Sequence, residues 1–192
     1  MPDSARRLAD HTTLRLGGPA RSWVRADTQD ELVDAVRTCD EAGEPVLVLA
    51  GGSNLVVADE GFDGTVVEVA TTGVRADHES EDATCGGVVV TVAAGESWEA
   101  VVEQAVDRGW VGVEALSGIP GSVGATPIQN VGAYGQEVAQ TLDSVRVWDR
   151  RLHGFRTFAA ADCGFGYRTS RLKADPGRHV VVEATFQFRQ GQ

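Results

Sequence analysis

The feature that most constrains the fold is a glycine-rich stretch in the middle of the chain, residues 116–135 (LSGIPGSVGATPIQNVGAYG). Its five glycines and two prolines argue against a regular helix or strand, because both residue types interrupt these elements. Its isoleucines, valines and tyrosine are nevertheless too apolar for a solvated linker. Such a segment either wraps a ligand, which its glycine N–H groups can approach closely, or packs on itself as an Ω-loop.

The composition indicates a globular chain of one large or two small domains. It has 192 residues, of which 42% are hydrophobic and 23% charged. The net charge of −11 argues against nucleic-acid binding, so a phosphate-bearing ligand would need a local site. We expect no membrane span and no signal peptide, because no apolar run is long enough. Cys39, Cys85 and Cys163 lack CxxC spacing and are typical of reduced thiols in a cytoplasmic protein, and the four scattered histidines predict no metal site.

The clearest element is a helix over residues 28–42. Thr28 and Glu31 form a capping box, and Gly43 supplies the stop. An apolar strand over 46–50 follows, which we expect to be buried on both faces. It leads into Gly51-Gly52-Ser53-Asn54, where backbone N–H groups could cradle a phosphate, although ordinary turn chemistry explains this tetrapeptide equally well.

The remaining pattern predicts an α+β protein. Within residues 12–25 we expect a strand that enters a turn at 17–19, followed by a second short strand. We also expect a second helix over 97–108, with Val106 facing inward. Further strands are expected at 65–70, 88–94, 144–149, 154–158 and 178–188, with a surface hairpin loop near 78–84 and a helical turn at 159–163. Residues 1–70 form a small βαβ unit in this interpretation, and residues 71–192 form a larger α+β unit.

Five motifs, in order and spread over nearly the whole chain, together resemble one family, the UDP-N-acetylenolpyruvoylglucosamine reductases of peptidoglycan synthesis. They are TTLRLGG (12–18), LAGGSNL (49–55), GVEALSGIPG (112–121), PIQNVGAYG (127–135) and FGYRTS (165–170). The resemblance implies the two-subdomain FAD-binding fold of the vanillyl-alcohol-oxidase (PCMH) type. Residues 1–70 and 71–192 would be its two FAD-binding subdomains.

The resemblance also implies a reaction. NADPH reduces FAD, and the flavin passes hydride to the enolpyruvyl group of a UDP-sugar substrate, UDP-N-acetylglucosamine enolpyruvate. Arg168 matches the family's catalytic arginine, whose planar fork can stabilise carboxylate charge. In the alternative interpretation, Arg168 is a surface residue in a basic cluster with Arg171 and Lys173. Tyr167 is implied to line the substrate pocket, or else it packs in the core with its hydroxyl satisfied.

The binding residues follow from the same resemblance. FAD is expected to be non-covalent, because the Gly51–Gly52 loop lacks a flavin-linking histidine. Its implied contacts are Gly51, Gly52, Ser53, Asn54, Leu55, Ser117, Gly118, Ile119, Pro120, Gly121, Gly124, Ala125, Gly132, and backbone groups of Val181 and Val182. Ala125 replaces a serine that other members carry. Tyr134 is assigned to the substrate. Gln129 and Asn130 could bind the substrate or flavin, or tie the loop to itself.

One departure limits the resemblance. The family's proton-donating serine and a late glutamate would lie beyond residue 188, so we expect the substrate domain to be missing and the chain alone not to complete the reaction. Ser170 lies too close to Arg168 to serve as the acid. Three hypotheses stay open: the FAD-binding part of a reductase, a stand-alone FAD-binding module without turnover, and another oxidase of the same fold.

Overall fold

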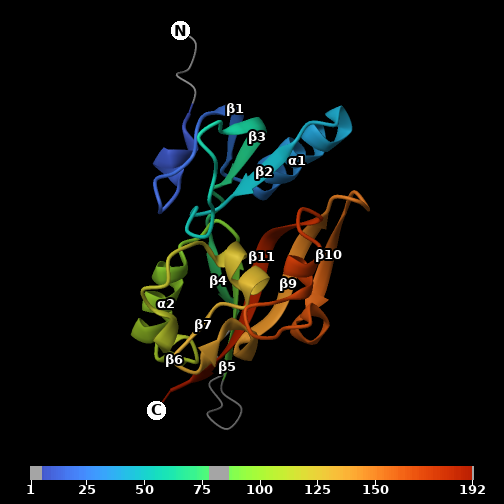
Figure 1. Ribbon diagram of the computed structural model, residues 1–192. Coiled ribbons are helices and arrows are strands. Elements are labelled where there is room, and N and C mark those ends of the chain that lie inside the picture. Colours follow the sequence, from blue (N-terminus) through green and yellow to red (C-terminus); the bar gives the residue numbers. More distant parts are fainter. Residues whose placement is uncertain (1–5, 78–86, 192) are drawn as a thin grey trace. The chain divides into compact units, whose positions relative to one another are not determined.

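The computed structural model describes residues 6–77 and 87–191. The chain divides into two compact units, Met1–Thr71 and Thr72–Gln192 (Figure 1). The expected hairpin loop near 78–84 lies outside the described residues, as does Cys85. Cys39 and Cys163 are buried free thiols, and burial raises the pKa of Cys163 to about 11.

The first unit is a parallel three-stranded sheet with one long helix. Its strands lie in the order β1-β3-β2, and α1 follows β1 in the chain, as in a βαβ unit. The bounds are β1 (Ala20–Ala26), α1 (Gln29–Ala42), β2 (Val46–Leu49) and β3 (Phe62–Val69). The helix packs on the sheet (Figure 1). Leu8, in the 3-10 helix η1 (Leu8–His11), belongs to a core cluster with Ala20, Leu49 and Val66.

The predicted caps of α1 are confirmed. The Thr28 hydroxyl accepts the Glu31 N–H at 3.2 Å, and the Glu31 carboxylate accepts the Thr28 N–H at 3.2 Å. Gly43 ends the helix in a left-handed conformation with φ of +66°.

Two expectations for this unit are wrong. Residues 12–16 form no strand, because the Thr12 hydroxyl donates to the Leu16 carbonyl at 2.9 Å and accepts the Leu16 N–H at 3.2 Å, which closes a local turn. In β2 only Leu49 is fully buried, because the strand lies at an edge of the sheet.

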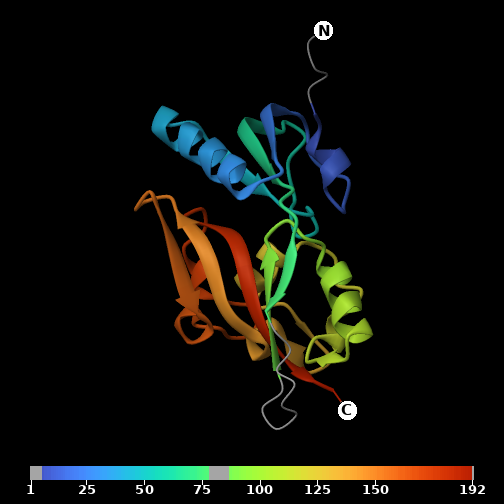
Figure 2. The same ribbon diagram turned by 180° about the vertical axis from the view of Figure 1, so that it is seen from behind.

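The second unit is built on an antiparallel sheet. Its strand order is β10-β9-β11-β5-β4, and β6 pairs with the end of β11. The bounds are β4 (Val74–Asp77), β5 (Gly87–Ala93), β6 (Trp110–Val111), β9 (Leu142–Asp149), β10 (Gly154–Ala159) and β11 (His179–Gln190). Figure 2 shows the hairpin of β9 and β10 in orange beside the red β11. The hairpin and the terminal strand agree with the sequence prediction.

Helix α2 (Trp98–Asp107) packs through an aromatic core. Ser97 caps it, and Trp98 lies 5.9 Å from the Phe186 ring, which stacks on Phe188 at 5.7 Å between centroids. Val106 is 53% exposed, so its inward placement is wrong. Trp98 extends the apolar stripe toward the N-terminus of the helix and leaves Val106 at its edge.

The glycine-rich segment is irregular, as predicted, and is broken into very short elements. They are η2 (Glu114–Leu116), η3 (Val123–Ala125), α3 (Thr126–Gln129), β7 (Gly132–Ala133), β8 (Gln136–Glu137) and η4 (Val138–Gln140). The η3 turn packs on β11 and β5. Two further short elements, η5 (Ala160–Cys163) and α4 (Arg171–Ala174), flank the FGYRTS motif. The first of these is the predicted helical turn.

Candidate functional site

The start of the glycine-rich segment binds the side-chain carboxylate of Glu99 in α2. The Ser117 hydroxyl donates to Glu99 Oε1 at 2.6 Å, and the Gly118 N–H donates to Glu99 Oε2 at 2.5 Å. The Ser117 hydroxyl first, and then the Gly118 N–H, lower the pKa of the Glu99 carboxyl. Gly118 has φ of +77°, and a Cβ there would meet no described atom within 4 Å. Both donors are therefore engaged by a carboxylate of the chain itself, while the Gly118 α-carbon faces open space.

Other glycines of the expected cofactor site are explained by packing within the chain. A Cβ on Gly124 would lie 2.7 Å from the Ala94 Cβ, and one on Gly132 would lie 2.9 Å from the Gln136 carbonyl oxygen. In the first unit, a Cβ on Gly52 would collide with the His11 carbonyl, and the Gly52 carbonyl accepts the Thr13 N–H at 3.2 Å. At these positions close approach of the backbone to itself already requires glycine.

The first-unit loop divides between exposed and packed residues. Gly51 and Asn54 are exposed, Ser53 is half-buried, and Leu55 packs against the cluster that contains Leu8. Leu55 thus has a structural role irrespective of any ligand.

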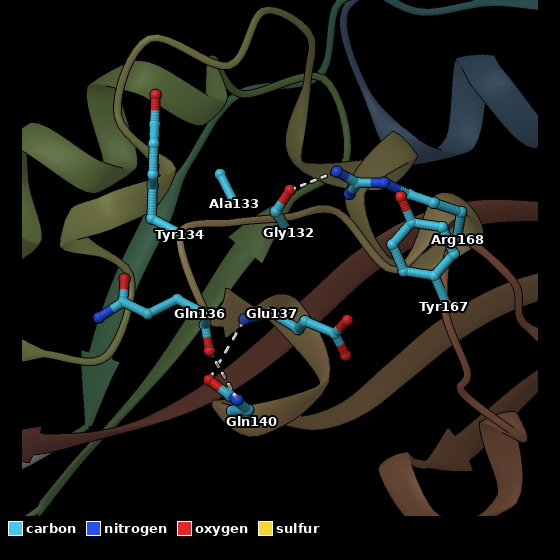
Figure 3. A pocket seen from close by; sticks show the side chains of 9 residues that line it. Gly132, Ala133, Tyr134, Gln136, Glu137, Gln140, Tyr167 and Arg168 are labelled. Atoms are coloured by element: carbon cyan, nitrogen blue, oxygen red, sulfur yellow. Dashed lines mark hydrogen bonds between the residues drawn. The ribbon is translucent and has the colours of Figure 1, made fainter.

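A pocket of about 460 Å³ lies in the second unit, between the residues around β7 and β8 and the FGYRTS loop. Figure 3 shows its lining, which combines backbone, two tyrosines, a carboxylate and a guanidinium. The lining residues are Gly132, Ala133, Tyr134, Gly135, Gln136, Glu137, Gln140, Tyr167 and Arg168.

Arg168 is held at the edge of this pocket. Its Nη2 donates to the Gly132 carbonyl at 2.5 Å, and its guanidinium lies 5.6 Å from the centre of the Tyr167 ring (Figure 3). Tyr167 is 84% exposed and lines the pocket, so the alternative in which it packs in the core is wrong. Tyr134 is 96% exposed and stands at the other end of the pocket. Both tyrosines are therefore accessible to a ligand.

Gln129 and Asn130 are not among the residues that line this pocket. Asn130 is 1% exposed, and its amide donates to the Glu137 carboxylate and to the Gly166 carbonyl, each at 3.0 Å. Its side-chain oxygen accepts the Ala139 N–H at 3.1 Å. These bonds support the alternative in which Asn130 ties the loops together. The Gln129 side chain accepts a hydrogen bond from Lys173 Nζ at 2.9 Å.

The other expected cofactor residues follow the path of the segment. The Gly121 carbonyl accepts the Trp98 N–H at 3.1 Å, which joins Ile119, Pro120 and Gly121 to the start of α2. Val182 is 3% exposed, and its carbonyl accepts the Ala94 N–H at 3.1 Å. Val182 is left out of the pairing of β11 with β9, because the register of that pairing shifts between Val181 and Glu183. Ala125, in η3, is half-buried.

The structure thus gathers Gly132, Tyr134, Tyr167 and Arg168 around one pocket, and Asn130 donates a hydrogen bond to the lining residue Glu137. The Ser117–Gly118 turn lies apart, against α2, and Gly51 to Leu55 belong to the first unit. Sequence reasoning missed Glu99, Glu137 and Lys173 as site residues. Only Lys173 carried a signal, because it is the single lysine of the chain beside sixteen arginines.

Comparison with known proteins defines the class. Residues 20–151 match the model of the FAD binding domain family, so the chain belongs to that family. A solved alkyldihydroxyacetonephosphate synthase shares the fold at 15% identity, with a TM-score of 0.64 over 99% of this chain and 38% of that one. The predicted α+β FAD-binding fold of the vanillyl-alcohol-oxidase type is confirmed.

More specific relatives carry one enzyme name. UDP-N-acetylenolpyruvoylglucosamine reductase of Cutibacterium acnes is 58% identical over 96% of this chain, which corresponds to 48% of that protein. The crystal structure of the Thermus caldophilus UDP-N-acetylenolpyruvylglucosamine reductase aligns with a TM-score of 0.76 and 32% identity, over 98% of this chain and 63% of that one. The chain spans about half the length of the curated relatives that it matches.

The described helices are all too short or too polar to cross a membrane.

Proposed function

We propose that this chain is the FAD-binding part of a UDP-N-acetylenolpyruvoylglucosamine reductase. The reaction is the NADPH-dependent reduction of UDP-N-acetylglucosamine enolpyruvate to UDP-N-acetylmuramate. The observation that carries the proposal is the 58% identity to a reductase of that name, maintained over 96% of the chain. The pocket lined by Arg168 and Tyr167 supports the proposal, because it holds a guanidinium that could bind a substrate carboxylate.

Backbone groups of the glycine-rich segments would hold FAD non-covalently. The Ser117 hydroxyl and Gly118 N–H support this, because they bind the Glu99 carboxylate in the structure and could bind a cofactor oxygen in its place if Glu99 moved aside. The exposed Gly51 and Asn54 offer further polar groups. When bound, FAD supplies the hydride that originates from NADPH. We assign no covalent link, because the Gly51–Asn54 loop contains no histidine.

Arg168 would bind the carboxylate of the enolpyruvyl group. Negative charge builds on C2 and that carboxylate as hydride arrives at the enolpyruvyl C3, and a guanidinium fixed in advance stabilises it without reorganisation. One guanidinium nitrogen is committed to the Gly132 carbonyl, which orients the fork. Tyr134 and Tyr167, exposed at the two ends of the pocket, would contact the substrate.

The serine of the FGYRTS motif, Ser170, is not suited to be the proton donor. Ser170 is 2% exposed, its hydroxyl donates to the Ile128 carbonyl at 2.8 Å, and it accepts the Lys173 N–H at 3.2 Å. A buried hydroxyl that already donates one hydrogen bond and accepts another is poorly placed to protonate a substrate carbon. The matched relatives are about twice as long, so a donor from their other half is consistent with the proposal.

The setting that we propose is the cytoplasm, with a small UDP-sugar as partner. The net charge of −11 supports the absence of a nucleic-acid partner, and the reduced state of Cys39 and Cys163 fits a reducing compartment.

The test is a chimera in which this chain replaces the matching half of the Cutibacterium acnes relative. We expect NADPH oxidation that depends on UDP-N-acetylglucosamine enolpyruvate, with UDP-N-acetylmuramate detected by mass spectrometry. In the chimera, Arg168→Ala should slow flavin reoxidation by the substrate by about 10²–10³-fold and leave flavin reduction by NADPH unchanged.

Stopped-flow measurement separates the two half-reactions. A chimera that binds FAD but forms no product would instead support the stand-alone binding module. Equal slowing of both half-reactions by Arg168→Ala would contradict the assigned role of Arg168.

A further inference from the structure

The single lysine of the chain is placed beside the proposed catalytic arginine. All sixteen other basic residues are arginines, yet position 173 in α4 carries lysine. Its ammonium group donates to the backbone carbonyl of Arg168 at 2.8 Å and to Gln129 Oε1 at 2.9 Å. An ammonium group is a compact donor with three hydrogens, so one atom can bridge two acceptors on different segments.

Arg168 needs such a restraint because its backbone is strained. Its φ is +53°, in the left-handed region that residues with a Cβ rarely adopt. This conformation persists only where surrounding contacts over-determine it. The guanidinium bond to Gly132 restrains the far end of the side chain, and the Lys173 bond restrains the carbonyl at its base.

Lys173 also joins the two segments that form the pocket. Two further bonds run in parallel between them: Asn130 donates to the Gly166 carbonyl at 3.0 Å, and Ser170 donates to the Ile128 carbonyl at 2.8 Å. Asn130 and Ser170 are buried, whereas Lys173 is exposed. Fold stability therefore depends mainly on the buried bonds, and the Lys173 contacts serve the local geometry of Arg168.

We propose that Lys173 is a positioning residue that fixes Arg168 in its left-handed conformation and so aims the guanidinium at the substrate carboxylate. The role rests on the proposed function of Arg168, but the contact that it requires is a property of this chain alone. Lys173 acts through Arg168 and does not touch the substrate.

The activity test uses the chimera described above. Lys173→Met keeps the aliphatic stem and removes all donors, and we expect it to slow flavin reoxidation by the substrate about tenfold, the loss of a charge-assisted hydrogen bond. Flavin reduction by NADPH should be unchanged. The control is Arg171→Met, which removes the same charge two residues away and should leave both half-reactions near the wild-type rates.

A double-mutant cycle shows whether Lys173 acts through the arginine. In an Arg168→Ala background, Lys173→Met should cause no further slowing. Full additivity of the two changes would overturn the proposal, as would a tenfold loss in Arg171→Met, because general electrostatics would then explain the effect.

A second measurement needs no catalysis. The ¹³Cα and ¹³Cβ chemical shifts of Arg168 in the 192-residue chain report its left-handed backbone. They should be unchanged in Arg171→Met and should move toward right-handed or extended values in Lys173→Met. Amine-selective acetylation of the folded wild-type chain, whose amines are Lys173 Nζ and the N-terminal amine, should cause the same change, with acetylated Lys173→Met as the control for the N-terminal amine.

The outcomes distinguish the two claims. An inactive wild-type chimera with the expected shift changes would refute the proposed function and leave the positioning contact supported. Unchanged Arg168 shifts in both Lys173→Met and the acetylated chain would overturn the positioning role, whatever the activity.

Discussion

Three residues of the two pocket-forming loops share an unusual backbone. Asn130, Tyr134 and Arg168 have φ of +44°, +49° and +53°, although none of them is glycine. Such conformations cost about 1–3 kcal/mol each and occur mostly where function requires them. Asn130 is compensated by its three hydrogen bonds and Arg168 by Lys173 and Gly132. Arg15 and His153 adopt the same conformation elsewhere, so these two loops hold three of the five such residues in the described part of the chain.

A second residue-scale feature lies away from the pocket, at the end of β9. Asp149 is fully buried and accepts hydrogen bonds from Arg178 Nη2 at 2.9 Å and from the backbone N–H of Arg151 at 3.0 Å. The Arg178 bonds chiefly hold the pKa of Asp149 down to about 2. His179 Nε2 lies 3.6 Å from the Asp149 carboxylate, and both ring nitrogens are buried without a hydrogen-bond partner among the described residues. Burial lowers the pKa of His179.

These two groups predict two separate losses of stability on acidification. His179 has a lowered pKa in the folded state, so the unfolded chain takes up its proton first and the free energy of unfolding falls as pH drops below about 6.5. Asp149 also has a lowered pKa, so its contribution is complete above about pH 4 and is lost as pH falls toward 2. That contribution is about 2 kcal/mol.

Urea unfolding at pH 7.5, 5 and 2.5 separates the two effects. His179→Gln should reduce the loss of stability between pH 7.5 and 5, and Asp149→Asn should reduce the loss between pH 5 and 2.5. Each variant is the control for the other. The idea fails if either variant retains the wild-type slope in its own interval.

At the scale of elements, α1 is stabilised by its N-terminal cap. Thr28→Ala removes the hydroxyl that accepts the Glu31 N–H, and we expect a loss of about 1 kcal/mol in the free energy of unfolding. Thr38→Ala is the matched control in the same helix. Its hydroxyl donates to the Asp34 carbonyl, which already belongs to the helix, so the change should stay within about 0.5 kcal/mol. Equal losses in the two variants, measured by urea unfolding, would contradict the capping assignment.

Elements with complete local signals could be predicted from the sequence. The capping box and Gly43 placed α1, alternation placed the β9–β10 hairpin, and a long apolar run placed β11. Where a signal was ambiguous, particular hydrogen bonds and strand pairing decided the structure. Residues 12–16 alternate like a strand, yet the Thr12 hydroxyl closes a turn there, and β4 was missed because only its pairing with β5 makes it a strand.

The site was predicted less completely for the same reason. Motifs placed Tyr167 and Arg168, but not the exposure of Tyr167. The Glu99 contact joins residues eighteen and nineteen positions apart, and the Lys173 contact to Gln129 spans 44. Hydrogen bonds over such separations depend on how loops fold back, which no periodicity encodes. The roles of the individual site residues stay predictions.

At the scale of the whole molecule, the negative net charge of the chain opposes the binding of a negatively charged cofactor. The chain carries −11, and the FAD that we assign to it carries a negative pyrophosphate. Long-range electrostatics therefore oppose binding, and local N–H and hydroxyl donors must provide the affinity; those of Gly118 and Ser117 can contribute only if the Glu99 carboxylate releases them.

Flavin binding by the purified 192-residue chain is the most direct test of this account. Titration with FAD should saturate at about one equivalent, as a single family domain requires, and acid precipitation should release the flavin into the supernatant because no residue of the Gly51–Asn54 loop can bond to it covalently. Failure to bind FAD would contradict the central claim, and yellow colour that stays with the precipitate would contradict the non-covalent assignment.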